Sequence, residues 1–128
     1  MYMAMGTPSK DGEDRISSTN LHQDMADAVN IMVYAYPPGS CALWDIFSAG
    51  DSLRISDYLQ KRYQEHNRGH PIHSQQYYLQ DNDLKILATQ GVRPYTIKQC
   101  KGQAIMIPAG CPHQVSLSSQ WRWSVISP

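Results

Sequence analysis

Short apolar segments that end at proline or glycine follow one another along this chain. Residues 26–36 are rich in β-branched and aromatic side chains and stop at Pro37, and residues 104–107 stop at Pro108. Proline lacks a backbone donor and glycine favours turns, so such short segments are typical of buried strands rather than of helices. Further strands are predicted over residues 41–47, 95–98, 114–117 and 121–126.

Two segments with helical patterns interrupt the predicted strands. Asp51 or Ser52 is a suitable N-cap for a helix that ends near His66, and a shorter helix is predicted from residue 81 or 83 to a cap at Gly91. The polar residues 10–20 are predicted to form a loop. We therefore expect an all-β fold of sandwich or barrel type with two short helical insertions, in a single domain over residues 1–128.

The charge balance and the hydropathy argue against two classes of partner. The 11 Lys and Arg equal the 11 Asp and Glu, so no direct DNA binding is expected. No segment approaches the roughly 18 apolar residues of a membrane helix, and the first residues lack the pattern of a signal peptide. We expect a soluble intracellular protein whose 3 cysteines are reduced, with Cys100 and Cys111 as buried free thiols.

His22, Asp24 and the distant His113 are candidate metal ligands. On an extended chain, residues i and i+2 project to the same face, so His22 and Asp24 are able to bind one ion. Adding His113 completes a facial triad that leaves three positions open on Fe(II), whereas zinc usually keeps one open position or recruits thiolates. The alternative is a solvated turn, although unpaired His and Asp beside an apolar strand are costly to bury.

Blocks of sequence on both sides of these ligands occur in a fixed order. They are Ser18 to Tyr34 (STNLHQDMADAVNIMVY), Leu43 to Phe47 (LWDIF), His70 to His73 (HPIH), Tyr78 with Leu79, and Ile107 to Val115 (IPAGCPHQV). Together they resemble JmjC (jumonji C) domains, and specifically the hairless-like branch of histone lysine demethylases. The last block is the most specific, because the turn residues and the ligand His113 match jointly.

The resemblance implies a fold, a chemistry and a substrate. The fold is a double-stranded β-helix, which is a cupin-like jelly roll, and His22, Asp24 and His113 bind Fe(II) with 2-oxoglutarate as cosubstrate. The implied reaction is the oxidative removal of methyl groups from lysine. In this branch the implied partner is the histone H3 tail, mono- or dimethylated at lysine nine, and the implied location is the nucleus.

Three residues are candidates for holding the remote carboxylate of 2-oxoglutarate, which requires a cation or several donors. Thr19 and Asn30 are the polar candidates, and Asn30 shares a face with His22 if the strand between them is unbroken. The resemblance implies a lysine on the closing strand, and Arg122 lies near that place. The alternative is that Arg122 is a surface cation between two Trp rings.

The amount of sequence before the ligands bears on activity. Only about 20 residues precede His22, whereas the resemblance implies much more, so we expect an incomplete β-helix with an exposed sheet edge that favours dimerisation. Beside the demethylase, two alternatives stay open: an inactive remnant that serves as an interaction module, and a protein hydroxylase of the same fold. Tyr34, Tyr36, Trp44 and Phe47 are expected in the core, and Asp27 is either a partner of His22 or a surface residue.

Overall fold

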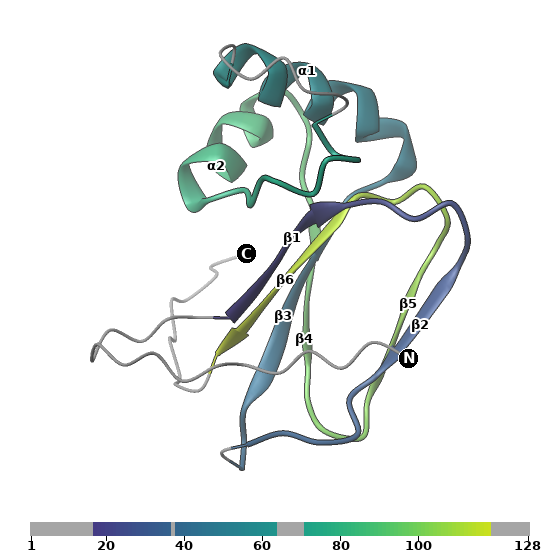
Figure 1. Cartoon of the computed structure of the whole chain (residues 1–128). Helices are drawn as coiled ribbons and strands as arrows, with labels where there is room; N and C mark the ends of the chain where they lie inside the picture. Colours follow the sequence, from purple (N-terminus) through teal and green to yellow (C-terminus); the bar gives the residue numbers. More distant parts are fainter. Residues whose placement is uncertain (1–16, 37, 64–70, 119–128) are drawn as a thin grey trace.

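Two antiparallel sheets form the β part of the molecule (Figure 1). The computed structural model describes residues 17–36, 38–63 and 71–118. The larger sheet has the strand order β1-β6-β3-β4, and the smaller sheet pairs β2 with β5. The strands are β1 Ser17–His22, β2 Ala28–Ile31, β3 Cys41–Ile46, β4 Tyr95–Gln99, β5 Ala104–Ile107 and β6 His113–Ser118.

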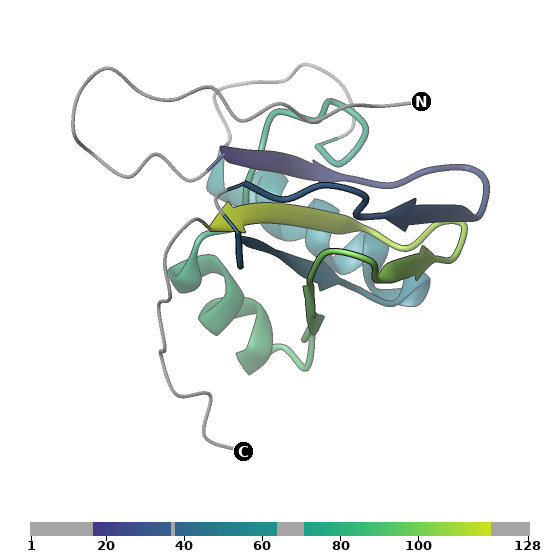
Figure 2. The same cartoon turned by 90° about the horizontal axis from the view of Figure 1, so that it is seen from below.

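The chain passes repeatedly from one sheet to the other. It leaves the larger sheet after β1 to form β2, returns for β3 and β4, and repeats the crossing through β5 to β6. The two sheets face each other across the interior, as Figures 1 and 2 show from two directions. This alternation is that of a jelly roll, so the predicted double-stranded β-helix with two helical insertions is confirmed.

The space between the sheets is filled by alternate side chains of the strands. On β3, Ala42, Trp44 and Ile46 are buried, and they form one cluster with Ile105 and Ile107 of β5. Successive side chains of a strand point to opposite faces, so each strand of this pair buries one face and exposes the other. Trp44 is therefore a core residue, as predicted.

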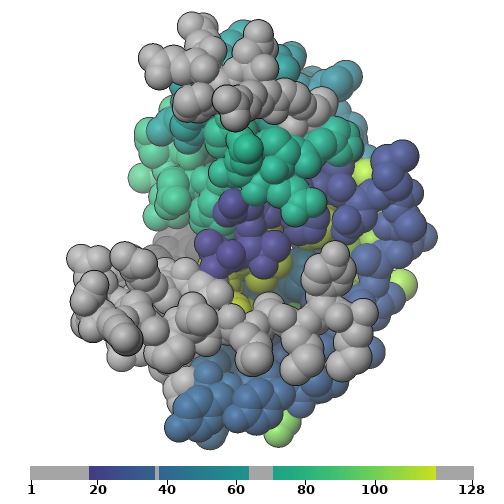
Figure 3. Space-filling view, in the orientation of Figure 1, coloured from purple at the N-terminus to yellow at the C-terminus, as the bar shows by residue number. Residues whose placement is uncertain are grey.

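The helices bury a second apolar core at one end of the larger sheet. Helix α1 spans Ser52–Arg62, after the short 3-10 helix η1 Ala49–Asp51, and α2 spans Asp81–Thr89. Figure 3 shows the green residues between and around the helices packed directly against β1, and the backbone N–H of Leu21 in β1 donates to the carbonyl of Tyr77, before α2, at 2.7 Å. The buried members of this core are Leu21, Phe47, Ile55, Leu59, Ile72, Leu79, Leu87 and Val92.

The two helices are held together by a buried carboxylate and end at defined residues. The side chain of Asp83 accepts a hydrogen bond from the Tyr58 hydroxyl at 2.6 Å and lies 2.9 Å from the Arg62 guanidinium.

Gly91, at φ +80°, follows α2 as the predicted cap, because glycine adopts that conformation more easily than an L residue with a side chain. Helix α1 ends at Arg62 rather than near His66, which lies outside the described residues. Neither helix is long and apolar enough to cross a membrane.

A buried glutamine joins the outer face of the larger sheet to the segment before α2. The side-chain oxygen of Gln114 accepts from the backbone N–H of Leu79 at 2.8 Å, and its amide nitrogen donates to the Leu79 carbonyl at 3.0 Å. The same nitrogen donates to Asp45 at 3.1 Å. One side chain thus satisfies both backbone groups of a fully buried residue.

We expect Gln114→Ala to lower the free energy of unfolding by about 1–3 kcal/mol, because it leaves buried backbone groups of Leu79 unpaired. Urea denaturation measures the change. Gln60→Ala, on an exposed position of α1, is the matched control and is expected to stay within about 0.5 kcal/mol of the unsubstituted protein. Equal losses in the two variants would show that the Gln114 bonds contribute no net stability.

The prediction of a buried strand over residues 26–36 is wrong in length and in burial. Strand β2 spans only Ala28–Ile31, with Val29 60% and Ile31 59% exposed. Within the described part of the chain, β2 pairs only with β5, and one face of this small sheet meets the core. Tyr34 and Tyr36 follow the strand and are also exposed, so their predicted core position is wrong. Phe47 is fully buried, as predicted.

The predicted loop over residues 10–20 is also corrected in its last part. Residues 17–20 belong to β1, which pairs with β6 and, among the described residues, is one of the two edge strands of the larger sheet. An edge strand exposes much of its surface, which explains why Ser18 and Thr19 are polar although they form a strand. The predicted strand over residues 121–126 lies outside the described residues.

Candidate metal centre

The predicted ligands His22, Asp24 and His113 lie together at one end of the sheets. His22 is the last residue of β1, His113 is the first residue of β6, and the two are register partners in the antiparallel ladder. Asp24 lies in the connection from β1 to β2. One ligand atom from each side chain lies within 4.8 Å of the other two. The structure therefore brings together residues that are far apart in the sequence.

Asp24 reaches this cluster by a different route from the predicted one. Strand β1 ends at His22, so His22 and Asp24 are not alternate residues of one strand. Instead, the Asp24 carbonyl accepts a hydrogen bond from the backbone N–H of Gly110 at 2.8 Å. Gly110 has φ +76°, which allows the turn before β6 to present that N–H. A contact between two loops thus positions the carboxylate.

The hydrogen bonds of the two histidines orient both rings for metal binding. The Nδ1 atom of His22 lies 2.8 Å from the Asn20 carbonyl, and the Nδ1 atom of His113 lies 3.0 Å from the Cys111 carbonyl. A carbonyl oxygen only accepts, so Nδ1 donates in each ring, and Nε2 is the nitrogen that has the lone pair in the neutral imidazole. The register of the β1–β6 pair shifts between Thr19 and His22, as at a β-bulge, and such a shift changes the direction of the side chains at the end of β1. Both histidines therefore offer Nε2 as a ligand.

Burial favours the neutral form of the His113 ring. Its side chain is 4% exposed, and this burial lowers its pKa below the usual value, an effect that His22 reinforces and that the Cys111 carbonyl and Asp24 oppose. The Trp44 ring stacks against the His113 ring at 6.0 Å between centroids. The His113 Nε2 lies 3.7 Å from the Asp24 carboxylate, whose side chain is 48% exposed. We therefore interpret this pair as two neighbouring ligands rather than as an ion pair.

The donor set fits a divalent first-row metal ion. Two neutral imidazoles and one carboxylate are nitrogen and oxygen ligands, which suit Fe(II) and need no thiolate. The cluster that the sequence predicted can therefore hold the predicted ion, and the binding itself stays a prediction.

Asp27 connects the two loops that carry the ligands. Its side chain accepts a hydrogen bond from the backbone N–H of Ala109 at 2.7 Å. Asp27 is an exposed residue, and its hydrogen bond is to the turn before His113 rather than to the ring of His22. Together with the bond between Asp24 and Gly110, it holds the β1–β2 loop against the β5–β6 turn.

We expect Asp27→Ala to weaken Ni(II) binding by about tenfold, because residues that orient metal ligands typically contribute 10–100-fold to affinity. Asp27→Asn keeps an acceptor oxygen in the same place and is expected to bind Ni(II) nearly as the unsubstituted protein does. Calorimetric titration with Ni(II) measures both variants. An unchanged affinity in Asp27→Ala would exclude this positioning role.

The candidates for the 2-oxoglutarate carboxylate lie on different elements. Thr19 is the register partner of Val115, which packs on the core between the sheets, so Thr19 belongs to the inner face of the larger sheet. Asn30 lies on β2 in the other sheet, so the chain from His22 to Asn30 is not one unbroken strand and the condition for a shared face is not met. Its position opposite the buried Ile105 places it on the inner face of that sheet. Arg122 lies outside the described residues.

Sequence reasoning missed the residue that holds Asn30. The buried side chain of Gln99 accepts a hydrogen bond from the Trp44 indole at 2.9 Å. Its amide nitrogen donates to the Asn30 carbonyl at 3.1 Å and to the Asn30 side-chain oxygen at 3.2 Å. Gln99 ends a strand without any motif around it, so only its apolar neighbours on the same face would have hinted at a buried amide.

A jelly roll with two histidines and a carboxylate at one end of its sheets defines a cupin-like protein with a candidate single-metal site. The family described as "JmjC domain, hydroxylase" matches residues 14–119, and the chain belongs to this family.

Comparison with individual proteins finds lysine-specific demethylases. The chain is 31% identical to Lysine-specific demethylase JMJ26 of Arabidopsis thaliana over 89% of the chain and 19% of that protein. It is 37% identical to Lysine-specific demethylase 3A-A of Xenopus laevis over 90% of the chain and 11% of that protein. It is 35% identical to the human Lysine-specific demethylase 3A over 90% of the chain and 12% of that protein. The chain thus spans less than a fifth of the length of each of these relatives.

Proposed function

We propose that residues 1–128 form one JmjC-like domain that binds Fe(II) and 2-oxoglutarate and removes methyl groups from histone lysine. The proposed substrate is the H3 tail, mono- or dimethylated at lysine nine, and the proposed place of action is the nucleus. The observation that carries this proposal is the convergence of His22, Asp24 and His113 within 4.8 Å at one end of the jelly roll. The family match and the names of the relatives support the substrate class.

Each residue of the site has a role in this proposal. His22 and His113 present Nε2 to the ion, and the Asp24 carboxylate offsets part of its charge. When bound, Fe(II) and 2-oxoglutarate would supply the oxidation of the N-methyl carbon by dioxygen, with release of formaldehyde and succinate. Thr19 and Asn30, on the inner faces of opposite sheets, donate hydrogen bonds to the cosubstrate, and Arg122 supplies the cation for its remote carboxylate. Buried His113 and Trp44 keep water from one side of the site.

Binding of the ion and the cosubstrate is tested without oxygen. Anaerobic addition of Fe(II) and 2-oxoglutarate to the protein is expected to produce a weak visible charge-transfer band. His113→Ala is expected to lose the band, whereas His73→Ala, an exposed histidine outside the cluster, is expected to keep it. A band that persists in His113→Ala would contradict the ligand assignment.

Turnover distinguishes the proposed reaction from its alternatives. With a dimethyl-lysine nine H3 peptide, the demethylase is expected to release succinate and formaldehyde and to lower the peptide mass by one CH2 unit in each step, because hydrogen replaces each methyl group. A protein hydroxylase would instead add one oxygen atom to its substrate. Binding of iron and 2-oxoglutarate without any peptide-dependent succinate would favour an interaction module. The predicted dimer is tested separately by sedimentation of the same protein.

A further inference from the structure

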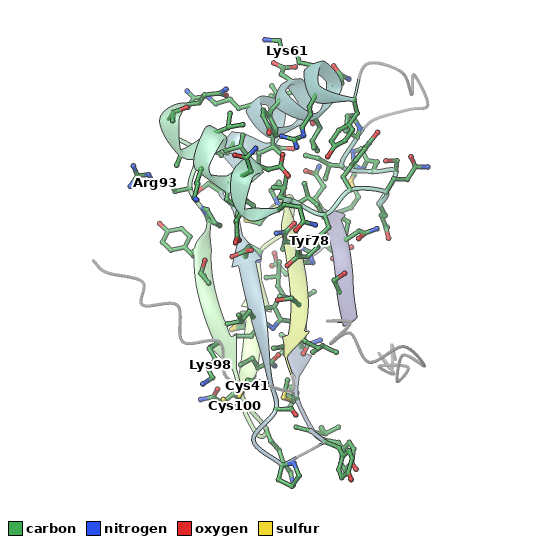
Figure 4. The ribbon with its side chains drawn as sticks, turned by 90° about the vertical axis from the view of Figure 1, so that its left-hand side faces the viewer. Cys41, Lys61, Tyr78, Arg93, Lys98 and Cys100 are labelled. Atoms are coloured by element: carbon green, nitrogen blue, oxygen red, sulfur yellow. The ribbon has the colours of Figure 1, made fainter. Side chains whose placement is uncertain are left out.

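Two cysteines lie in contact at the end of the larger sheet that is far from the helices. The Sγ atoms of Cys41 and Cys100 are 2.6 Å apart. Cys41 begins β3, and Cys100 directly follows β4. Figure 4 shows the two sulfur atoms beside Lys98, at the opposite end of the sheet from α1 and α2. Neither the proposed reaction nor its metal centre uses this pair.

The strand register explains why the two thiols meet. Ala42 pairs with Gln99, so the next residues of the antiparallel ladder, Cys41 and Cys100, stand opposite each other. Directly opposite residues of such a ladder have Cα atoms about 4.5–5.5 Å apart, which lies within the range that a disulfide requires. The backbone of β3 and β4 therefore already has the arrangement of a disulfide-linked pair.

The pair is accessible and separate from the third cysteine. All three thiols are partly exposed, so the predicted burial of Cys100 and Cys111 is wrong, and a small reagent in solvent can reach Cys41 and Cys100. Cys111 lies in the turn before β6, where its carbonyl faces His113. Burial and the neighbouring Cys100 raise the pKa of the Cys41 thiol, while Lys98 opposes this effect. This raised pKa disfavours the Cys41 thiolate, which is the form that a metal ion would bind.

We propose that Cys41 and Cys100 form a reversible disulfide, with a small-molecule disulfide such as oxidised glutathione as the oxidant. One cysteine gives up its proton, and its thiolate attacks a sulfur of the oxidant. This forms a mixed disulfide between the protein and one glutathione, and the other glutathione leaves as a thiolate that takes up a proton. The second cysteine attacks the protein sulfur of that mixed disulfide and releases the second glutathione. The two protein thiols are oxidised, and one oxidised glutathione is reduced to two thiols.

The disulfide links β3 to β4 across a sequence separation of 59 positions, which includes both helices. Closing so long a segment restricts the unfolded chain, so we expect the midpoint of thermal unfolding to rise by about 10 °C. The link is at the other end of β3 from Ile46, the register partner of His113. Ni(II) affinity is therefore expected to change by less than about twofold.

The experiment treats the full chain with oxidised glutathione and measures intact mass, followed by peptide mapping without reductant. The expected product is lighter by two hydrogen atoms, with Cys41 joined to Cys100, and dithiothreitol restores the original mass. Cys41→Ser and Cys100→Ser are each expected to stop at a stable glutathione adduct on the remaining partner. Cys111→Ser is the control and is expected to form the disulfide as before.

Three results would overturn the proposal. They are an unchanged mass after treatment, separate glutathione adducts on Cys41 and Cys100 of the unsubstituted chain, and a bond from either cysteine to Cys111 or to a second chain. Because the measurement needs neither iron nor a histone peptide, its outcome is independent of the proposed demethylase activity.

Discussion

His113→Ala is expected to weaken Ni(II) binding by about a hundredfold or more, because removal of a ligand costs at least as much as removal of the residues that orient one. Ni(II) replaces Fe(II) in this measurement because it does not react with oxygen. Asp24→Ala is expected to lose a similar factor. Calorimetric titration of the folded variants with Ni(II) measures both losses.

The Asp24→Ala variant tests the metal site with less risk that the variant fails to fold. His113 is buried and stacks on Trp44, so its truncation also removes packing from the core. The Asp24 side chain is 48% exposed, and its backbone carbonyl, which bonds Gly110, is unchanged in the variant. A folded Asp24→Ala protein that binds Ni(II) as tightly as the unsubstituted chain would disprove the three-residue site. His73→Ala is the matched histidine control.

The Phe47→Ala variant is expected to lose about 3–5 kcal/mol of the free energy of unfolding, as truncation of a buried Phe typically does. Phe47 is fully buried in the core beneath the helices. Its backbone N–H also donates to the carbonyl of Pro112 at 2.8 Å, so it links the end of β3 to the turn before His113. Since small domains have about 5–15 kcal/mol in total, we expect a large fall in the urea midpoint.

Leu53→Ala is the control for Phe47→Ala. Leu53 lies on α1 with 74% of its surface exposed, and its truncation is expected to change the free energy of unfolding by less than about 0.5 kcal/mol. A loss below about 1 kcal/mol in Phe47→Ala would mean that the helical part rearranges to fill the cavity, which close-packed cores do only partially.

The helices and most strands were predictable because their signals are local. Gly91 follows the end of α2 where the sequence predicts a cap, and the segment before Pro108 is a strand. Burial was less predictable, because it depends on which face another segment covers. Val29 and Tyr34 lie in a segment with the composition of a buried strand, yet both are exposed. Val29 is on β2, in a sheet of only two described strands, and Tyr34 lies beyond the end of β2.

The amino-acid sequence by itself determined the family, the jelly-roll class and the three candidate ligands, because these follow from residue types in a particular order. Only the tertiary structure decided how the ligands meet. The hydrogen bond from Gly110 positions Asp24, and the hydrogen bond from Ala109 to Asp27 holds the adjoining loop. The Cys41–Cys100 contact depends on the register of β3 and β4. Such contacts join segments separated by more than fifty positions. No local pattern encodes them, because they arise only when the folded chain brings both segments together.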